Sequence, residues 1–521
     1  MSTTTTKGTK LDTAVILTSG GIFGWGGVSQ ETSVGPMTRV GGVPLFMRAL
    51  LTLQRARFTN VMVLCGEEMA TMRAGLRDDQ RITMALRWLP VREFPPDDPR
   101  TWQALGVEVQ GACLVLGARA VFGPGLLERL REEMVEGQMA LVIRRPTMPE
   151  CRSDGPYEGF NPLAEHRANR LVALHDWTGN VLPPSDRADQ WCVATDMVVV
   201  PATLLAATGL PASPRKRVRL SGAGARATGH GASPDVSQTP SGRLLRPVSS
   251  AVYPIRALLE RAAGDGLVRV LATSPGTQHW YREVHRPADH KAAERTLLQS
   301  LKGDLEGFVD RYFNRKVSGA LTRVFLKFGL SANAVTALSL VIGLLSGVSF
   351  AMGGYAAGII GALLFQLSAI VDCCDGEIAR LTFTESSSGE LFDLIADNVV
   401  HYAIFAGITW ALATREPGVW NWVPVGVGTA VIIGNLFSLW LVLRARHLRK
   451  TQGWSNPTQA HWGNFILQHV ASRDFSVLVL FLALINHLDW FLWLTAIGSN
   501  VFWIVMAWMT RTRPSLQPRH G

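Results

Sequence analysis

The C-terminal part of the chain is dominated by long apolar stretches. Residues 331–510 consist of such stretches separated by short polar loops, whereas the apolar runs within residues 1–300 are only as long as β-strands. A helix needs about 20 apolar residues to cross a bilayer, and inside lipid only helices and closed barrels satisfy their own backbone hydrogen bonds. The sequence therefore predicts an all-α transmembrane domain over residues 331–510 with six helices, of which the fifth is short: 332–352, 355–374, 388–413, 420–443, 474–487 and 490–510.

Four aspartates lie inside these apolar stretches or at their ends. Asp372 and Asp375 are three residues apart and Asp393 and Asp397 are four apart, so each pair lies on one face of its helix. Ionised carboxylates at bilayer depth are costly and usually face a polar cavity inside the protein. Two helices that present such pairs to each other would form an oxygen-rich site for Mg²⁺ or Mn²⁺. The alternative is that these acids only hold helices together.

The residues around the aspartates indicate a phosphate ligand. Gly376 and Gly389 leave room for a ligand near the backbone, and Arg380 supplies a planar cation suited to phosphate. Residues 372–397 have the pattern D-x2-D-G-x2-A-R-x8-G-x3-D-x3-D, which resembles the signature of the CDP-alcohol phosphotransferases at all eight fixed positions. The resemblance implies a membrane transferase that moves the phosphoryl-alcohol group of a CDP-alcohol to an acceptor hydroxyl. A phosphodiester forms, as in phospholipid synthesis, and CMP is released.

The resemblance also implies roles for individual residues. Asp372, Asp375 and Asp393 would bind the metal, and Asp397 would act as general base on the acceptor hydroxyl and could share a metal. The pocket for the CDP group would be formed by Asn333, Asp372, Gly376, Ala379, Arg380 and Gly389. Candidates for binding a phosphate or carboxylate of the acceptor are Arg444, Arg446 and Arg473. Anchoring of the membrane loops by positive charge explains these three arginines equally well.

The N-terminal part alternates short β-type runs with helical stretches. Such runs occupy residues 14–20, 60–66, 112–117 and 140–145, and an early helix follows residue 45. This alternation predicts a Rossmann-like α/β domain with a mostly parallel sheet. The glycine-rich turn at 19–27 and the segment VGGVPL at 40–45 resemble the sugar-phosphate nucleotidyltransferases. In that family such a turn wraps a nucleoside triphosphate.

This part of the chain lacks charges that the nucleotidyltransferases use. Residues 23–27 contain no Arg, and three further replacements affect the triphosphate-binding Lys and the two metal-binding carboxylates: Gly35, Ala118 or Arg119, and His285. Without these charges the electrostatic stabilisation of phosphoryl transfer is missing. The sequence predicts a degenerate nucleotidyltransferase-like domain over residues 1–300, and compensation by Arg39 or Glu283 stays open.

Two further segments complete the layout. Residues 211–247 are rich in Pro, Gly, Ser and Arg, which predicts a disordered insertion. Residues 301–330 place apolar and charged side chains on opposite helix faces, which predicts an interfacial amphipathic helix. The whole layout resembles fused inositol-phosphate cytidylyltransferase/CDP-alcohol phosphotransferase proteins, and the resemblance implies a homodimer. CDP-inositol and CDP-diacylglycerol both stay open as donors.

Charge and cysteine usage bear on location. Lys and Arg beside the spans, facing anionic membrane lipids, explain the net charge of +10 more simply than nucleic-acid binding does. The first residues lack the apolar core and cleavage site of a secretory signal, and the six cysteines show no CxxC pair, so reduced thiols are expected. Basic residues follow spans two and four and occupy the tail at 511–521. The positive-inside rule then predicts a multi-pass protein of the inner (cytoplasmic) membrane with both termini in the cytoplasm.

Three other functions compete with a single transferase activity. A bifunctional enzyme would also make the CDP-alcohol from CTP in its N-terminal domain. A non-catalytic membrane scaffold would be favoured had any aspartate of the motif been lost, and none is. A cation transporter would use intramembrane acids but gives no reason for the Gly, Ala and Arg at fixed spacing.

Overall fold

The computed structural model describes residues 10–18, 21–23, 34–77, 79–145, 161–175, 191–208, 253–274, 277–301, 315–415, 421–452 and 475–511. The chain divides into two compact units, Met1–Ser300 and Leu301–Gly521. The insertion predicted at 211–247 lies outside the described residues, as do residues 302–314 of the predicted interfacial helix.

The N-terminal unit is built on a nine-stranded sheet with the order β5-β4-β1-β6-β11-β8-β12-β10-β9. Strands β5, β4, β1 and β6 are parallel to one another, and β12 is parallel to β8. Strand β11 runs antiparallel to β6, β8 and β9, and β10 runs antiparallel to β12 and β9. The other seven strands run in one direction, so the sheet is mixed but mostly parallel, as expected. Alternation of strands and helices predicts the layers but carries no information on the direction of β11. The strands are β1 (Leu11–Leu17), β4 (Asn60–Cys65), β5 (Ala85–Pro90), β6 (Ala112–Gly117), β8 (Met139–Arg144), β9 (Leu163–Arg167), β10 (Arg170–His175), β11 (Trp191–Pro201) and β12 (Val268–Ala272).

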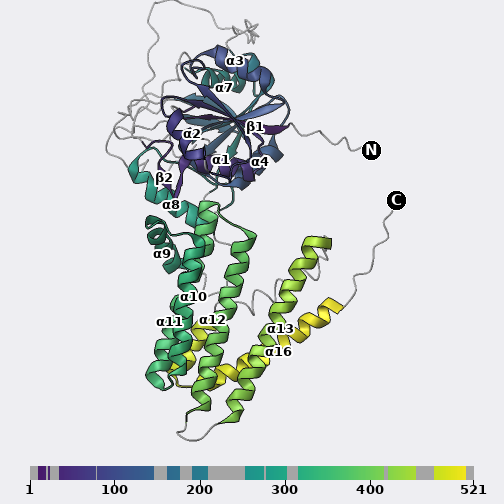
Figure 1. Cartoon of the computed structure of the whole chain (residues 1–521). Helices are drawn as coiled ribbons and strands as arrows, with labels where there is room; N and C mark the ends of the chain where they lie inside the picture. Colours follow the sequence, from purple (N-terminus) through teal and green to yellow (C-terminus); the bar gives the residue numbers. More distant parts are fainter. Residues whose placement is uncertain are drawn as a thin grey trace, which may run out of the picture. The chain divides into compact units, whose positions relative to one another are not determined.

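Helices cover both faces of this sheet (Figure 1). Successive residues of β1 alternate between two apolar cores: Val15 belongs to the core beneath α3 and α7, and Ile16 to the core beneath α1, α2 and α4. Burial on both faces explains why β1 is apolar from Ala14 to Leu17. The helices are α1 (Leu45–Arg55), α2 (Met69–Arg77), α3 (Pro99–Glu108), α4 (Pro124–Glu133), α6 (Ala202–Ala206), α7 (Pro254–Gly264) and α8 (Pro287–Ser300). Two small ribbons pair β2 (Arg39–Val40) with β3 (Val43–Pro44) and β7 (Ala120–Phe122) with β13 (Tyr281–Glu283).

The described part of the C-terminal unit is entirely helical. Five of its helices are long and apolar enough to cross a membrane, whereas α15, within the predicted fifth span, has only ten described residues. Helix α11 continues well past the predicted end at residue 374, so a single helix carries both Asp372 and Arg380. The helices are α9 (Arg315–Lys327), α10 (Ala332–Ala351), α11 (Tyr355–Thr382), α12 (Ser387–Ala413), α13 (Trp422–Gln452), α15 (Phe475–Leu484) and α16 (Leu488–Arg511).

Small residues let α10 and α12 approach each other closely. A Cβ atom added at Gly407 would lie 2.2 Å from the carbonyl oxygen of Gly347, and one at Gly343 would lie 2.4 Å from the Val400 side chain. In lipid, apolar side chains gain little free energy by leaving the apolar solvent, so helices associate mainly by van der Waals packing. Small residues allow this packing to be close. This contact fixes α12, which carries two of the four aspartates, against α10.

We expect Gly407→Ala to destabilise the membrane unit by about 1–3 kcal/mol, because the new methyl group forces two backbones apart. The matched control is Gly426→Ala on α13, where an added Cβ meets nothing within 4 Å. Thermal unfolding of both purified variants in detergent is the measurement. Equal melting temperatures for the two variants would contradict the proposed close packing.

Candidate active site

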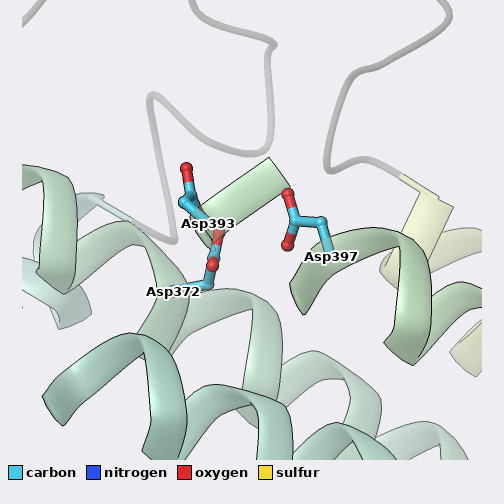
Figure 2. A group of neighbouring side chains, drawn as sticks. All are labelled: Asp372, Asp393 and Asp397. Carbon is cyan, nitrogen blue, oxygen red and sulfur yellow. The ribbon is translucent and has the colours of Figure 1, made fainter. Parts of the chain in front are cut away.

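Three of the four aspartates come together where α11 faces α12. Asp372 on α11 and Asp393 and Asp397 on α12 each place a carboxylate oxygen within 4.8 Å of the other two (Figure 2). Asp372 is only 4% exposed, and the other two side chains are half-buried. Like charges held this closely in a buried site repel one another unless a cation or a proton lies between them.

This group of carboxylates fits a divalent metal ion. Hard cations such as Mg²⁺ prefer several oxygen ligands at one point, and often keep water and substrate oxygens in the remaining positions. Among the described residues this is the one group of three or more acidic, histidine or cysteine side chains with that geometry. Asp372, Asp393 and Asp397 are therefore the residues that would hold the metal.

Asp375 lies outside this group of three. Its Oδ2 atom accepts a hydrogen bond of 2.5 Å from the Thr336 hydroxyl, and both side chains are buried. Thr336 lies near the start of α10, so this hydrogen bond connects α10 to α11. The sequence predicted all four aspartates as metal ligands, with Asp397 also as the base, and the structure brings Asp372, Asp393 and Asp397 together.

The predicted CDP-binding residues lie close to these aspartates. A Cβ atom at Gly376 would lie 3.6 Å from the Arg380 guanidinium, so the arginine lies beside this glycine on α11. A Cβ atom at Gly389 would lie 3.5 Å from the Asn333 amide oxygen, which brings together the starts of α10 and α12. Ala379 is half-buried on α11.

The predicted acceptor-binding arginines are only partly described. Arg444 is exposed on α13, and its guanidinium lies 5.3 Å from the centre of the Trp440 ring. The side chain of Arg446 and the whole of Arg473 lie outside the described residues. Their part in binding the acceptor stays a prediction.

Glu377 has a structural role that the sequence analysis did not identify. This glutamate of α11 is 3% exposed and accepts hydrogen bonds from the hydroxyls of Ser318 (2.9 Å) and Thr322 (2.7 Å), both on α9. Ser318 and Thr322 are four residues apart and therefore lie on one helix face. This spacing, together with a Glu inside the motif, was the sequence signal that could have indicated the contact. The two bonds fix the rotation of α11, and with it the direction of the neighbouring aspartates.

We expect Glu377→Leu to lower stability by about 1–3 kcal/mol for each hydroxyl that loses its acceptor. Glu377→Gln keeps an acceptor oxygen and should melt close to the native protein. Thermal unfolding in detergent measures both, with Asp489→Leu, at a half-exposed acid on α16, as the control for loss of a carboxylate. The assignment fails if Glu377→Leu melts like this control.

The N-terminal unit contains a polar pocket that only the fold reveals. It is lined by Gly117, Arg119, Ala120, Asp196, Tyr281, Glu283 and His285. Burial raises the pKa of Asp196 to about 6, and burial lowers the pKa of Arg119 to about 10. Burial alone would lower the pKa of His285, but the nearby carboxylates of Glu283 and Asp196 raise it overall. Asp196 was not among the predicted site residues, since one Asp in an apolar strand gives no signal of its own.

Comparison with known families assigns the C-terminal unit. Residues 330–512 match the model of the family described as CDP-alcohol phosphatidyltransferase. These residues form a CDP-alcohol phosphatidyltransferase domain. The match confirms the family expected from the aspartate motif. Together with the five apolar helices, it identifies an integral membrane protein.

Curated relatives of this chain bear the name bifunctional IPC transferase and DIPP synthase. The protein from Thermococcus kodakarensis is 30% identical over 172 residues, which are 33% of this chain and 37% of that protein. The one from Archaeoglobus fulgidus is 31% identical over 27% of this chain and 28% of that protein, and the one from Rubrobacter xylanophilus is 32% identical over 30% and 34%. The chain thus spans about a third of the length of the curated relatives it matches.

Two solved structures also show similarity to this chain. The inositol-1-phosphate CTP transferase from T. maritima is 14% identical with a TM-score of 0.33, covering 56% of this chain and 96% of that one. HddC from Yersinia pseudotuberculosis is 10% identical with a TM-score of 0.34, covering 54% of this chain and 98% of that one.

Proposed function

We propose that the CDP-alcohol phosphatidyltransferase domain transfers a phosphoryl-alcohol group from a CDP-alcohol to an acceptor hydroxyl. The observation that carries this proposal is the group of three carboxylates within 4.8 Å inside the matched domain. An acceptor oxygen would bond to the phosphorus of the donor while the bond from that phosphorus to CMP breaks. The hydroxyl proton would pass to Asp397, and CMP would leave with the electron pair of the broken bond.

The chain's own residues would prepare this step in three ways. Asp372 and Asp393 would hold Mg²⁺ or Mn²⁺, which when bound offsets the charge on the diphosphate, and Asp397 could share this metal. Asp375, the other predicted ligand, lies three residues from Asp372 on α11. Arg380, which lies beside Gly376, would bind a phosphate oxygen. Asn333 and Gly389, which lie side by side, would border the nucleotide.

The donor and acceptor alcohols are part of the proposal. The resemblance to fused inositol-phosphate cytidylyltransferase/CDP-alcohol phosphotransferase proteins supports an inositol-containing donor such as CDP-inositol, and CDP-diacylglycerol is the second candidate. The name of the curated relatives supports a bifunctional enzyme. In this chain the second activity would be synthesis of the donor from CTP by the N-terminal unit. Two replacements oppose this second activity. Ala118 is buried where a metal-binding carboxylate would be needed, and Gly35 stands in place of a Lys.

The location and assembly belong to the proposal as well. The charge pattern supports an inner-membrane protein whose two termini lie in the cytoplasm, in contact with anionic lipids. A homodimer follows from the resemblance to the family alone.

The purified protein in detergent should release CMP when it is given the right pair of substrates. Each of several CDP-alcohols is incubated with Mg²⁺ and a panel of acceptor alcohols, and CMP and the phosphodiester are both measured. The same preparation of Asp393→Asn serves as the background. If no pair gives release above that background, the transferase proposal fails and a scaffold is favoured.

A further inference from the structure

The backbone of the turn after β1 binds the carboxylate of Asp196, a residue of the same chain. The Oδ1 atom of Asp196 accepts a hydrogen bond of 2.9 Å from the Ile22 N–H, and the Phe23 N–H also interacts with this carboxylate. Successive backbone N–H groups in a turn are a common binding site for phosphate and other anions. Asp196 lies on β11, 174 residues after Ile22, so the contact exists only in the folded unit.

Two glycines, Gly21 and Gly117, lie directly against the Asp196 side chain. A Cβ atom at Gly21 would lie 2.3 Å from the Oδ2 atom of Asp196, so any larger residue there would have to displace this carboxylate. Met197 pairs with Leu116 across β11 and β6, which places Asp196 opposite Gly117. A Cβ atom at Gly117 would lie 3.2 Å from the Asp196 Cβ. The described part of the glycine-rich turn is therefore closed over a side chain of the protein.

The cations of the pocket also face carboxylates of the chain. Arg119 and His285 both interact with Asp196, and Glu283 lies 3.7 Å from the His285 ring and 3.7 Å from the Arg144 guanidinium. A triphosphate that entered here would meet two carboxylates and would have to displace them from these partners. Repulsion between like charges and the loss of existing contacts both oppose its binding.

We propose that residues 21–23 form an anion site whose permanent occupant is the Asp196 carboxylate, so that the N-terminal unit binds no nucleoside triphosphate there. A group held in place by the fold competes at a high effective concentration with any ligand from solution. In this arrangement the backbone N–H groups of the turn have a hydrogen-bond acceptor even when no nucleotide is bound. It does not rest on the transfer reaction proposed for the membrane unit.

The test measures binding of inorganic pyrophosphate and of CTP to the full-length protein by calorimetry. Every variant carries Asp372→Asn and Asp393→Asn, so that the membrane site takes no diphosphate. The parent should show no saturable binding, whereas Asp196→Ser, which empties the turn, should bind pyrophosphate at least about tenfold more tightly. Asp196→Asn removes the charge but keeps an acceptor for the Ile22 N–H, and should gain much less affinity than Asp196→Ser. Glu283→Gln removes a charge from the same pocket but leaves the turn filled, and should also gain much less.

Each outcome bears on the proposal. Saturable CTP binding by the parent that Arg119→Ala abolishes would overturn it, as would a folded Asp196→Ser protein that gains no affinity. Equal gains in Asp196→Asn and Asp196→Ser would show that charge alone excludes the ligand, and would overturn occupancy of the turn. If Asp196→Ser fails to fold, the exchange rates of the backbone amides in the parent test the proposal instead. The Ile22 and Phe23 amides should exchange slowly, and CTP should not slow them further.

Discussion

Asp397→Asn should abolish transfer while leaving the binding of the CDP-alcohol within a few-fold of the native value. Loss of a general base typically costs about 10²–10⁴ in rate. The substitution keeps the size of the side chain, and Asp372 and Asp393 still offer their oxygens to a metal. Turnover and donor affinity of the purified variant, each measured at saturating Mg²⁺, give the result.

The matched control for this substitution is Asp489→Asn, at a half-exposed acid near the start of α16. It removes one carboxylate from the same unit and should leave turnover unchanged. Since Asp397 also lies within the group of three carboxylates, a metal titration separates its two possible roles. Recovery of turnover at high Mg²⁺ would make Asp397 a ligand only, and near-normal turnover at ordinary Mg²⁺ would exclude it as the base.

Removal of divalent metal should eliminate activity, and Mg²⁺ or Mn²⁺ should restore it. The candidate ligands are all carboxylates, and such oxygen donors favour these two ions. Asp372→Asn and Asp393→Asn should each raise the metal concentration needed for half-maximal activity by an order of magnitude or more, and Asp375→Asn should also be sensitive.

A second measurement of the same prediction does not depend on turnover. A ligand that binds only the folded state stabilises it, by about 2.7 kcal/mol at a concentration one hundred times its dissociation constant. The melting temperature of the native protein should therefore rise with added Mg²⁺, and that of Asp372→Asn should rise much less. Full activity after thorough chelation, together with no thermal shift, would show that the three carboxylates have another purpose.

The sequence alone determined the features that depend on neighbours along the chain. Apolar stretches of membrane length predicted the helices, because a helix in lipid needs about 20 such residues whatever it packs against. The spacing of Asp393 and Asp397 placed both on one face of α12, because helical periodicity is a local property. The eight fixed positions of the motif led to the family that the comparison confirms.

Only the tertiary structure decided which side chains meet. Packing of α11 against α12 joins Asp372 to Asp393 and Asp397, while Asp375 turns to Thr336 on α10 and Glu377 to Ser318 and Thr322 on α9. In the N-terminal unit, the reversed direction of β11 brings Asp196 to a turn 174 residues away. These contacts depend on helix packing and strand order, which residue spacing does not encode, because a long-range contact forms only when the whole core sets the two segments side by side.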